Sequence, residues 1–412
     1  MLTWFKISLR NIVKNGRRSL TTILAIAFGF AAINLFQGYV HSTYKNLSKG
    51  AIQGEGLGHL TIFKKDFLTK GKLYPEKYMF SRDEVERISS IVKNRAEVKL
   101  VTPRLGISGM VSNGRNSTIF IAQGLVPDDD VIIRGDISRL RIFQGAYLSN
   151  KDPSGAVMAS DLATMLNIKQ GDNAVIMSST YAGMVNALDV TVTGIVNTGM
   201  AATNDKLMLL TYQHAQNLMD FQGAERLVVL LQNGADLGAA RSDLAKTLGD
   251  AGFAVEIRTW QDLSVFYNQV RNMFDMIFAF IFSIVLIIVV MSVVNTMSMS
   301  VMERTREIGT LRALGLKKYG IKFLFSIEGL LLGLLGCIGG LAVFFAVYYV
   351  IGYIHPTYVP PAGSTPVPLE IDIVVAAIAR NILFMAALSL VASFVPARRS
   401  SNMPIIDALG HV

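Results

Sequence analysis

One carboxyl group inside a long apolar run is the first residue of this sequence whose chemistry needs an explanation. Glu328 lies shortly after Ile321, where the run begins. An acid within a membrane helix is a functional hypothesis by default, because its ionised form is costly in hydrocarbon. Either Glu328 takes part in proton transport, or it is hydrated near the interface or pairs with Lys322 or a basic loop residue. We favour the second, structural or coupling role.

Two further polar side chains interrupt apolar runs. Arg380 can extend toward the outer interface or pair with Glu370 or Asp372. Asn295 can hydrogen-bond a neighbouring helix or face the end of its run. Asn295, Glu328 and Arg380 are therefore candidate intramembrane site residues with structural or coupling roles.

Motifs for enzymatic catalysis are missing from the sequence. The nearest approach to a phosphate-binding loop, Gly71-Lys72-Leu73, lacks the upstream glycine and the final hydroxyl residue, and neither G-x-S-x-G nor H-E-x-x-H occurs. The single cysteine, Cys337, excludes a disulfide within the chain and a paired-cysteine zinc site, and the five histidines are scattered. We expect no catalytic residue, no bound metal and no ATP hydrolysis by this chain.

A short charged segment at 303–320 joins two of the apolar runs. It places Ile308, Leu311 and Leu314 at helical spacing and has a helix stop at Gly315. A linker exposed only to solvent would not need this pattern, whereas a surface helix that docks on a cytoplasmic partner would. The candidate docking residues are Glu303, Arg304, Arg306, Glu307, Ile308, Gly309, Arg312 and Gly315.

Composition and charge placement indicate a membrane protein. Hydrophobic residues make up 51% of the 412 residues and charged residues 17%, against about 25% in soluble domains. Much of the net charge of +9 lies beside apolar runs: residues 1–18 hold five basic residues and no acid, and residues 303–322 hold six basic and two acidic residues. This is the positive-inside pattern. A nucleic-acid binder would instead carry a basic face on its folded domain.

Four apolar runs are long enough to cross a membrane, and the charge pattern predicts that both termini lie in the cytoplasm. The first run exceeds the apolar part of a usual signal peptide, so we expect an uncleaved span. The predicted segments are an amphipathic helix (1–18), the first span (19–40), an outer domain (41–270), a stalk and second span (271–302), the charged loop (303–320), the third span (321–352), an outer loop (353–371), the fourth span (372–395), ended by Pro396, and a cytoplasmic tail (396–412).

The insertion at 41–270 has the pattern of an α+β domain, with two lobes as an open alternative to one. A capping box begins a helix at Ser81 to Glu84, and Asn113-Gly114 forms a turn between two strands. Strands are predicted near 59–63, 98–102, 107–111, 118–124, 174–177, 190–196, 226–231 and 254–257, and helices near 81–92, 161–166 and 237–248.

The third predicted span contains two pairs of small residues at helical spacing, Gly329 with Gly333 and Gly336 with Gly340. Small residues let membrane helices approach closely. We therefore expect these four glycines to lie at specific helix contacts.

Several stretches together resemble the superfamily of ABC transporter permeases that contains macrolide exporters such as MacB, the lipoprotein-release permeases LolC and LolE, and the cell-division permease FtsX. The resemblance covers essentially the whole chain. It rests on Leu9-Arg-Asn11 and Gly16-Arg-Arg18, on the outer-domain stretch 156–163 followed by Gly171-Asp172, on Asn295 with 301–315, on Glu328 and the glycines after it, and on Pro396-Ala-Arg-Arg399 with 404–409.

The resemblance implies a permease subunit, not an enzyme, in the bacterial inner membrane. Two permease chains, identical or related, would sit on a dimer of separate ATPase subunits that bind ATP and Mg²⁺, and this chain would bind no cofactor. The loop at 303–315 would be the coupling helix seated on the ATPase, and work would be done on the periplasmic side. Macrolide exporters fuse the ATPase to the N-terminus of the permease, so the amphipathic start of this chain implies a separate ATPase chain.

The leading functional hypothesis is extraction or export of a lipophilic substrate, most like lipoprotein release, because the stretch at 54–62 resembles lipoprotein-release permeases. Drug or peptide efflux with a periplasmic adaptor is the first alternative. The second is FtsX-like signalling to a cell-wall hydrolase, for which a domain of about 230 residues is large. The substrate, the ATPase, the choice between homodimer and heterodimer, and the presence of an adaptor or lipoprotein acceptor stay open here.

Overall fold

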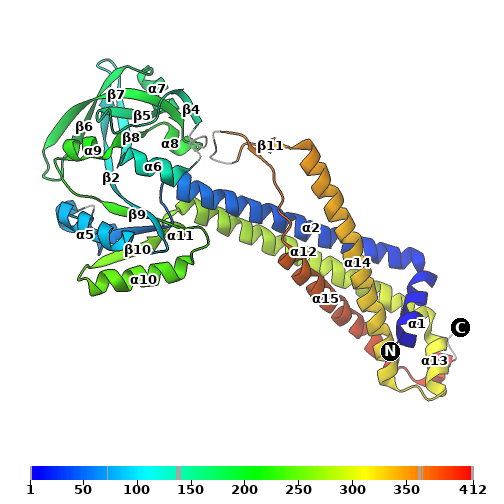
Figure 1. Ribbon diagram of the computed structural model, residues 1–412. Helices are drawn as coiled ribbons and strands as arrows, with labels where there is room; N and C mark the ends of the chain where they lie inside the picture. Colours follow the sequence, from blue (N-terminus) through cyan, green and yellow to red (C-terminus); the bar gives the residue numbers. More distant parts are fainter. Residues whose placement is uncertain (1, 72, 136–140, 361–362, 364, 410–412) are drawn as a thin grey trace. The chain divides into compact units, whose positions relative to one another are not determined.

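A computed structural model describes residues 2–71, 73–135, 141–360, 363 and 365–409, and the chain divides into two compact units. The first, the helix unit, comprises Met1–Tyr44, Val270–Pro356 and Pro368–Val412. The second, the sheet unit, comprises Lys45–Gln269 and Thr357–Val367. In the chain, the large mixed domain therefore follows the first long helix and precedes the others (Figure 1).

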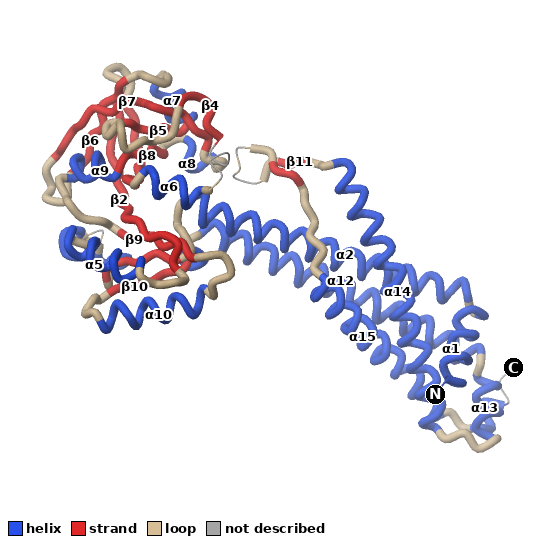
Figure 2. The backbone as a smooth tube through the Cα atoms, in the orientation of Figure 1, coloured by secondary structure: helices blue, strands red, loops and turns tan. Residues whose placement is uncertain are grey.

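Four helices of the described residues are long and apolar enough to span a membrane (Figure 2). They are α2 (Gly16–Lys49), which continues into the π-helical turn η1 (Gly50–Gly54), α12 (Val265–Glu303), α14 (Lys318–Ile354) and α15 (Val375–Asn402). The predicted continuity of the stalk with the second span is seen in α12, which has no break over its 39 residues. Shorter helices of the same unit are α1 (Leu2–Lys14), α13 (Thr305–Ala313) and α16 (Ile405–Leu409).

The last long helix does not end at Pro396, contrary to the sequence-based prediction. α15 continues through the buried Pro396 to Asn402, and Pro404 follows the helix end instead. Proline lacks an amide donor and its ring crowds the carbonyl four residues earlier, here that of Ala392. Membrane helices tolerate this loss where their neighbours support the helix. The close packing of α15 on α14 holds this helix end in place.

Strands β1 to β10 of the sheet unit form one ten-stranded sheet in which part of the strand order closes on itself. The order is β10-β1-β9-β2-β3-β8-β5-β7-β4, and β6 pairs with both β2 and β7, so β2, β3, β8, β5, β7 and β6 form a ring of pairings. The strands are β1 (Leu60–Lys64), β2 (Val98–Ser112), β3 (Ser117–Leu125), β4 (Arg141–Gly145), β5 (Gly155–Ala159), β6 (Asn173–Ser179), β7 (Val185–Asn197), β8 (Leu207–Thr211), β9 (Arg226–Leu231) and β10 (Val255–Thr259).

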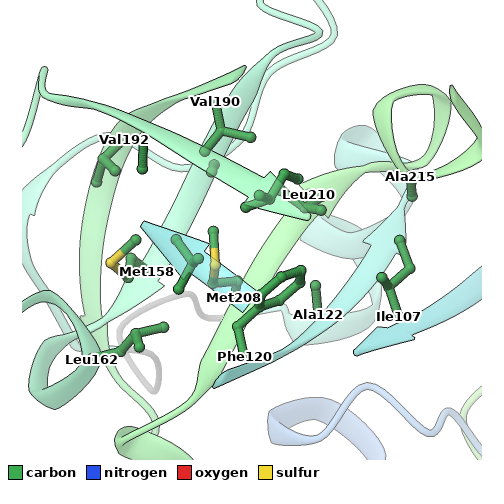
Figure 3. Packing of buried hydrophobic residues seen from close by; sticks show 14 of the residues in the cluster. Ile107, Phe120, Ala122, Met158, Leu162, Val190, Val192, Met208, Leu210 and Ala215 are labelled. Carbon is green, nitrogen blue, oxygen red and sulfur yellow. The ribbon is translucent and has the colours of Figure 1, made fainter. Parts of the chain in front are cut away.

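One long strand joins two lobes of the sheet unit. β2 pairs with β9 over its first residues and with β3 and β6 toward its end, so the two strands predicted at 98–102 and 107–111 are one. Inside the ring of pairings, buried side chains such as Phe120, Met158 and Leu210 form one core (Figure 3). Ile62, Leu227 and their neighbours form a second core with two helices of the other lobe, α5 (Arg82–Lys93) and α10 (Leu237–Asp250).

Local sequence signals set several element ends. The capping box at Ser81 is present: Glu84 N donates to Ser81 Oγ, and Ser81 N donates to Glu84 Oε2 at 2.8 Å. Asn113 Oδ1 accepts from two amides of the β2–β3 turn, and Gly114 has φ +86°. The remaining helices are α3 (Phe67–Lys70), α4 (Pro75–Tyr78), α6 (Pro127–Arg134), α7 (Ser160–Leu166), α8 (Ala201–Asn204), α9 (Tyr212–Met219) and α11 (Trp260–Leu263), and β11 (Thr357–Tyr358) pairs with β12 (Val367–Pro368).

A candidate coupling site where the long helices end

Glu328 is buried in the helix unit, and donors from the end of α12 and the residue after it surround its carboxylate. Ser300 Oγ donates to Oε1 at 3.3 Å, and Arg304 Nη1 lies 3.4 Å from Oε2. Arg304 also donates through Nε to Glu307 at 3.0 Å, and its guanidinium lies over the ring of Phe325. We call Ser300, Arg304, Glu307 and Glu328 the Glu328 cluster. The acid thus pairs with a basic loop residue, although with Arg304 and not with Lys322.

The Glu328 cluster connects three segments that are separate in the chain. Ser300 belongs to α12, Arg304 and Glu307 lie at the start of α13, and Glu328 belongs to α14. Removal of one partner of a buried ion pair leaves an uncompensated charge and typically costs about 3–5 kcal/mol. The position of α13 relative to the two long helices is therefore fixed by a contact that is costly to break.

The two faces of α13 have different roles in the packing. Thr305, Ile308 and Gly309 are buried, and Ile308 belongs to the same core cluster as Val301 and Phe325. The opposite face leaves Arg306, Thr310, Leu311 and Leu314 exposed. Of the predicted docking residues, Ile308 and Gly309 therefore attach α13 to its own chain, whereas Leu311 and Leu314, absent from that set, are free to contact a partner.

The charged residues around α13 also contact both ends of the chain. Arg18 forms an ion pair with Glu303, and Lys14 Nζ lies 3.9 Å from Glu307. Arg312 donates to the carbonyl of Met403, between α15 and α16. Each exposed ion pair contributes little stability by itself. Together they connect α13 to the N-terminal helices and to the C-terminal segment. Gly315 ends this region with φ +98°, a conformation that favours glycine.

The other two predicted intramembrane residues, Asn295 and Arg380, do not belong to the Glu328 cluster. Asn295 is exposed on α12, and its side chain makes no hydrogen bond among the described residues. Arg380 is exposed on α15. Its two proposed partners bind elsewhere: Asp372 pairs with His41 at 2.9 Å, and Glu370 accepts from Ser42 at 3.5 Å.

Polar contacts that sequence reasoning missed join the long helices in their place. Thr22 and Thr296 share a hydrogen bond of 2.5 Å between α2 and α12. Asn381 of α15 donates to Asn34 at 2.9 Å and to Gln37 at 2.7 Å, both on α2. Thr22, Asn34 and Gln37 all interrupt the first apolar run, which is the signal that could have identified them.

The four predicted packing glycines lie on two different contacts of α14. Side chains added at Gly329 and Gly333 would overlap Ser393 and Ser389 of α15. Side chains added at Gly336 and Gly340 would overlap Ile26 and Phe30 of α2. Glycine thus lets α14 approach two neighbours closely along one helix.

No group of three or more metal-ligating side chains occurs in the described ranges. The arrangement of the site is suited to holding helices together and passing on their movement.

Two families of known proteins match this chain over most of its length. A family described as the MacB-like periplasmic core domain matches residues 19–247, and one described as the FtsX-like permease C-terminal matches residues 279–405. The second match includes α13, Glu328 and all four packing glycines.

Individual relatives match at low identity. The chain is 31% identical over 156 residues to the macrolide export ATP-binding/permease protein MacB of Hyphomonas neptunium, covering 37% of this chain and 22% of that protein. It is 23% identical over 350 residues to an ABC transporter permease of Methanocaldococcus jannaschii, covering 81% and 80%. It is 22% identical over 333 residues to the lipoprotein-releasing system transmembrane protein LolC of Neisseria meningitidis serogroup B, covering 77% and 79%. The chain therefore spans only about a fifth of the length of this MacB protein, and it spans 34% of the length of the permease YtrF of Bacillus subtilis.

Among solved structures, the periplasmic region of MacB from Actinobacillus actinomycetemcomitans matches with a TM-score of 0.39 and 14% identity, covering 54% of this chain and 95% of that chain. The extracellular domain of the transporter YknZ matches with a TM-score of 0.35 and 11% identity, covering 49% and 99%.

Proposed function

Because this chain belongs to the family of ABC transporter permeases with a MacB-like periplasmic core domain and an FtsX-like C-terminal region, we propose that it passes the work of a separate ATPase across the membrane. The observation that supports this most is the Glu328 cluster, which fixes α13 to α12 and α14. A partner that pushes on the exposed face of α13 moves two long helices together. In this proposal α13 is the coupling helix, and a dimer of ATPase subunits binds ATP and Mg²⁺.

We further propose that the N-terminus, α13 and the C-terminus lie in the cytoplasm and that the sheet unit lies in the periplasm. The basic residues beside α1, α13 and the end of α15 support this orientation through the positive-inside rule. A second permease chain, identical or related, completes the assembly. The exposed apolar side chains along α12, including Phe280, Ile287 and Met291, are available to that chain or to lipid.

The proposed substrate is a lipophilic molecule taken from the outer leaflet, most like a lipoprotein. The support is that LolC, a protein named for lipoprotein release, matches more than three quarters of this chain. The test is reconstitution of the permease with its ATPase in lipid nanodiscs. We expect a purified triacylated lipoprotein to bind and to change the rate of ATP hydrolysis. Absence of both effects, with an ATPase complex that forms normally, rejects this substrate class.

Efflux of drugs or peptides is the second candidate, because the protein named for macrolide export shows the highest identity among the relatives reported above. This function predicts that a deletion strain is more sensitive to macrolides and that a periplasmic adaptor copurifies with the permease. Unchanged sensitivity together with a lipoprotein-processing defect favours release over efflux.

A further inference from the structure

A buried group of charges lies in the sheet unit, far along the chain from the Glu328 cluster. Arg104 of β2 forms an ion pair with Asp130 of α6, and Arg134 of α6 donates to the same carboxylate at 2.5 Å. Tyr147 donates its hydroxyl to Asp130 and accepts from Arg134 Nε at 3.1 Å. Arg104 is 1% exposed, Asp130 0% and Arg134 4%. We call these four residues the Asp130 cluster.

Asp130, at the centre of the cluster, is ionised throughout the physiological pH range. Burial alone raises the pKa of Asp130, but the charges of Arg134 and Arg104 outweigh it and hold the pKa at about 2. Burial lowers the pKa of Arg134, but Asp130 and Tyr147 together outweigh it, and the net shift of the pKa is upward. Removal of one member of such a group leaves an uncompensated buried charge, which is strongly destabilising. Because its contacts are costly to break, the cluster is a fixed point of the sheet unit.

This fixed point holds the helical turn in which the first long helix ends. The last residues of α2 and the turn η1 belong to the sheet unit. Arg134 donates through Nη1 to the carbonyl of Gly54, the last residue of η1, and lies 3.5 Å from the carbonyl of Gln53. Carbonyls at a helix end have no partner within the helix, and a guanidinium is a strong donor to them.

Glycines after η1 let the chain pass close to the Asp130 cluster. Gly56 has φ +69°, and a Cβ there would lie 3.6 Å from Nη2 of both arginines. Gly58 has φ +64°, and a Cβ there would overlap Val228. The next residue, His59, accepts from Leu231 N through Nδ1 at 3.1 Å. Gly56 and Gly58, through their positive φ, and His59, through its hydrogen bond, therefore have structural reasons for their identity, so these residues are not needed as a mark of the substrate.

We propose that Arg134, with Arg104, Asp130 and Tyr147 holding it, is a positioning residue for coupling: it fixes the end of α2 to the sheet unit. Movement of α2 then reaches the sheet unit without being lost in a flexible turn. This inference rests on the proposed function, because it gives α2 work to transmit. Its structural half, the immobility of the helix end, is independent of any substrate.

The structural half is tested by distance measurement between two spin labels. In the full-length chain with Cys337→Ser, labels are attached at Lys45→Cys, near the end of α2, and at Lys151→Cys in the sheet unit, both exposed positions. We expect one narrow distance distribution in the parent and its loss in Arg134→Gln and Asp130→Asn. Arg95→Gln is the matched control, because it removes an ion pair with Asp243 that does not contact η1. A distribution that stays narrow in Arg134→Gln overturns the proposal.

The coupling half is tested in the complex with its ATPase. We expect Arg134→Gln to hydrolyse ATP but to transport less substrate per ATP, with Arg134→Lys partly restoring the ratio, because lysine keeps the charge without the planar fork of donors. Tyr147→Phe, which removes one hydroxyl, provides a milder variant if Arg134→Gln does not fold. If Arg134→Gln shows a broad distance distribution but transports as much substrate per ATP as the parent, the coupling role is rejected. If the parent complex itself shows no coupling, the proposed function fails, and the distance measurement still decides whether the helix end is fixed.

Discussion

Arg304 and Glu328 form a pair in which the two partners have unequal exposure. The side chain of Arg304 is 14% exposed and that of Glu328 4%. Glu328→Gln keeps the shape but removes the buried charge, and Arg304 keeps Glu307 as a counter-charge, so we expect destabilisation below the roughly 3–5 kcal/mol typical of broken buried pairs. Thermal unfolding of the purified permease measures this. The double variant Arg304→Gln/Glu328→Gln should lose less than the sum of the two single variants. Strict additivity would show that the two side chains do not interact.

The Asp130 cluster predicts a specific acid sensitivity. The pKa of Asp130 in the fold is about 2, below its ordinary 3.8, because Arg134 and Arg104 outweigh the effect of burial. A depressed carboxyl pKa contributes stability that is present above pH 4 and is lost as the pH falls from about 4 to about 2, on the order of 2 kcal/mol. Unfolding of the sheet unit followed by its tyrosine signal should show this loss. Asp130→Asn should be less stable at pH 7 and should lack this acid-dependent loss, whereas Asp128→Asn, an exposed neighbour, should behave as the parent.

For single residues, the sequence predicts the chemical type of the side chain that a buried charge contacts better than it predicts which residue supplies it. An acid shortly after the start of an apolar run implies a cation from the adjoining loop, and Arg304 is one. The Asp130–Arg134 spacing is also visible, because residues four apart lie on one helix face. Nothing in the sequence indicates that Arg104, 26 residues earlier on a strand, completes the same cluster, since that contact depends on how β2 and α6 pack.

Two glycines of α14, Gly336 and Gly352, allow a test of helix packing in which one serves as the control for the other. A Cβ at Gly336 would lie 2.5 Å from Cβ of Ile26, whereas nothing lies within 4 Å of one at Gly352 on the same helix. We expect Gly336→Ala to lower stability by roughly 1–3 kcal/mol through overpacking against α2. Gly352→Ala should be neutral or slightly stabilising, because alanine favours helix. Equal melting temperatures for the two variants would contradict the close approach of α14 to α2.

The proposed coupling role of α13 gives a second prediction at the same scale. Arg306 is exposed and forms no ion pair among the described residues, so Arg306→Glu should leave the spans folded while it separates ATP hydrolysis from transport. Glu307→Arg should also uncouple, but it adds a cation beside Arg304 and Lys14 and should lower the melting temperature as well. Transport and ATPase assays on the reconstituted complex distinguish them. Lys317→Glu, an exposed charge change just outside α13, serves as the control. Normal coupling in Arg306→Glu would place the ATPase contact elsewhere.

Element ends were the least predictable feature, for identifiable reasons. Pro396 is a helix breaker in water, but close packing against α14 carries α15 past it to Asn402. β2 resembles two short strands because Pro103, Arg104 and Gly106 interrupt its apolar pattern. Arg104 is in fact buried by its ion pair, and Gly106 N donates to Glu225 at 2.7 Å. The four apolar helices and the mixed domain between the first two follow from length and composition, whereas these details depend on tertiary partners.

At the scale of the whole molecule, the two polar clusters hold different long helices, each at one end. The Glu328 cluster fixes α13 to α12 and α14, and the Asp130 cluster fixes the turn after α2. Within the helix unit, the long helices interact through glycines and a few hydrogen bonds.

This arrangement transmits work outward only if the two fixed ends lie on opposite sides of the membrane. In a Cys337→Ser background, Leu314→Cys marks the end of α13 and Lys151→Cys marks the sheet unit, both at exposed positions. With a membrane-impermeant maleimide, we expect residue 151 to be labelled in right-side-out vesicles and residue 314 only in inside-out vesicles. Labelling of both positions from the same side would remove the basis of the proposed coupling, because the ATPase and the sheet unit would then share one compartment. The reverse pattern would place the ATPase-binding face outside the cell, where no ATP supply supports it.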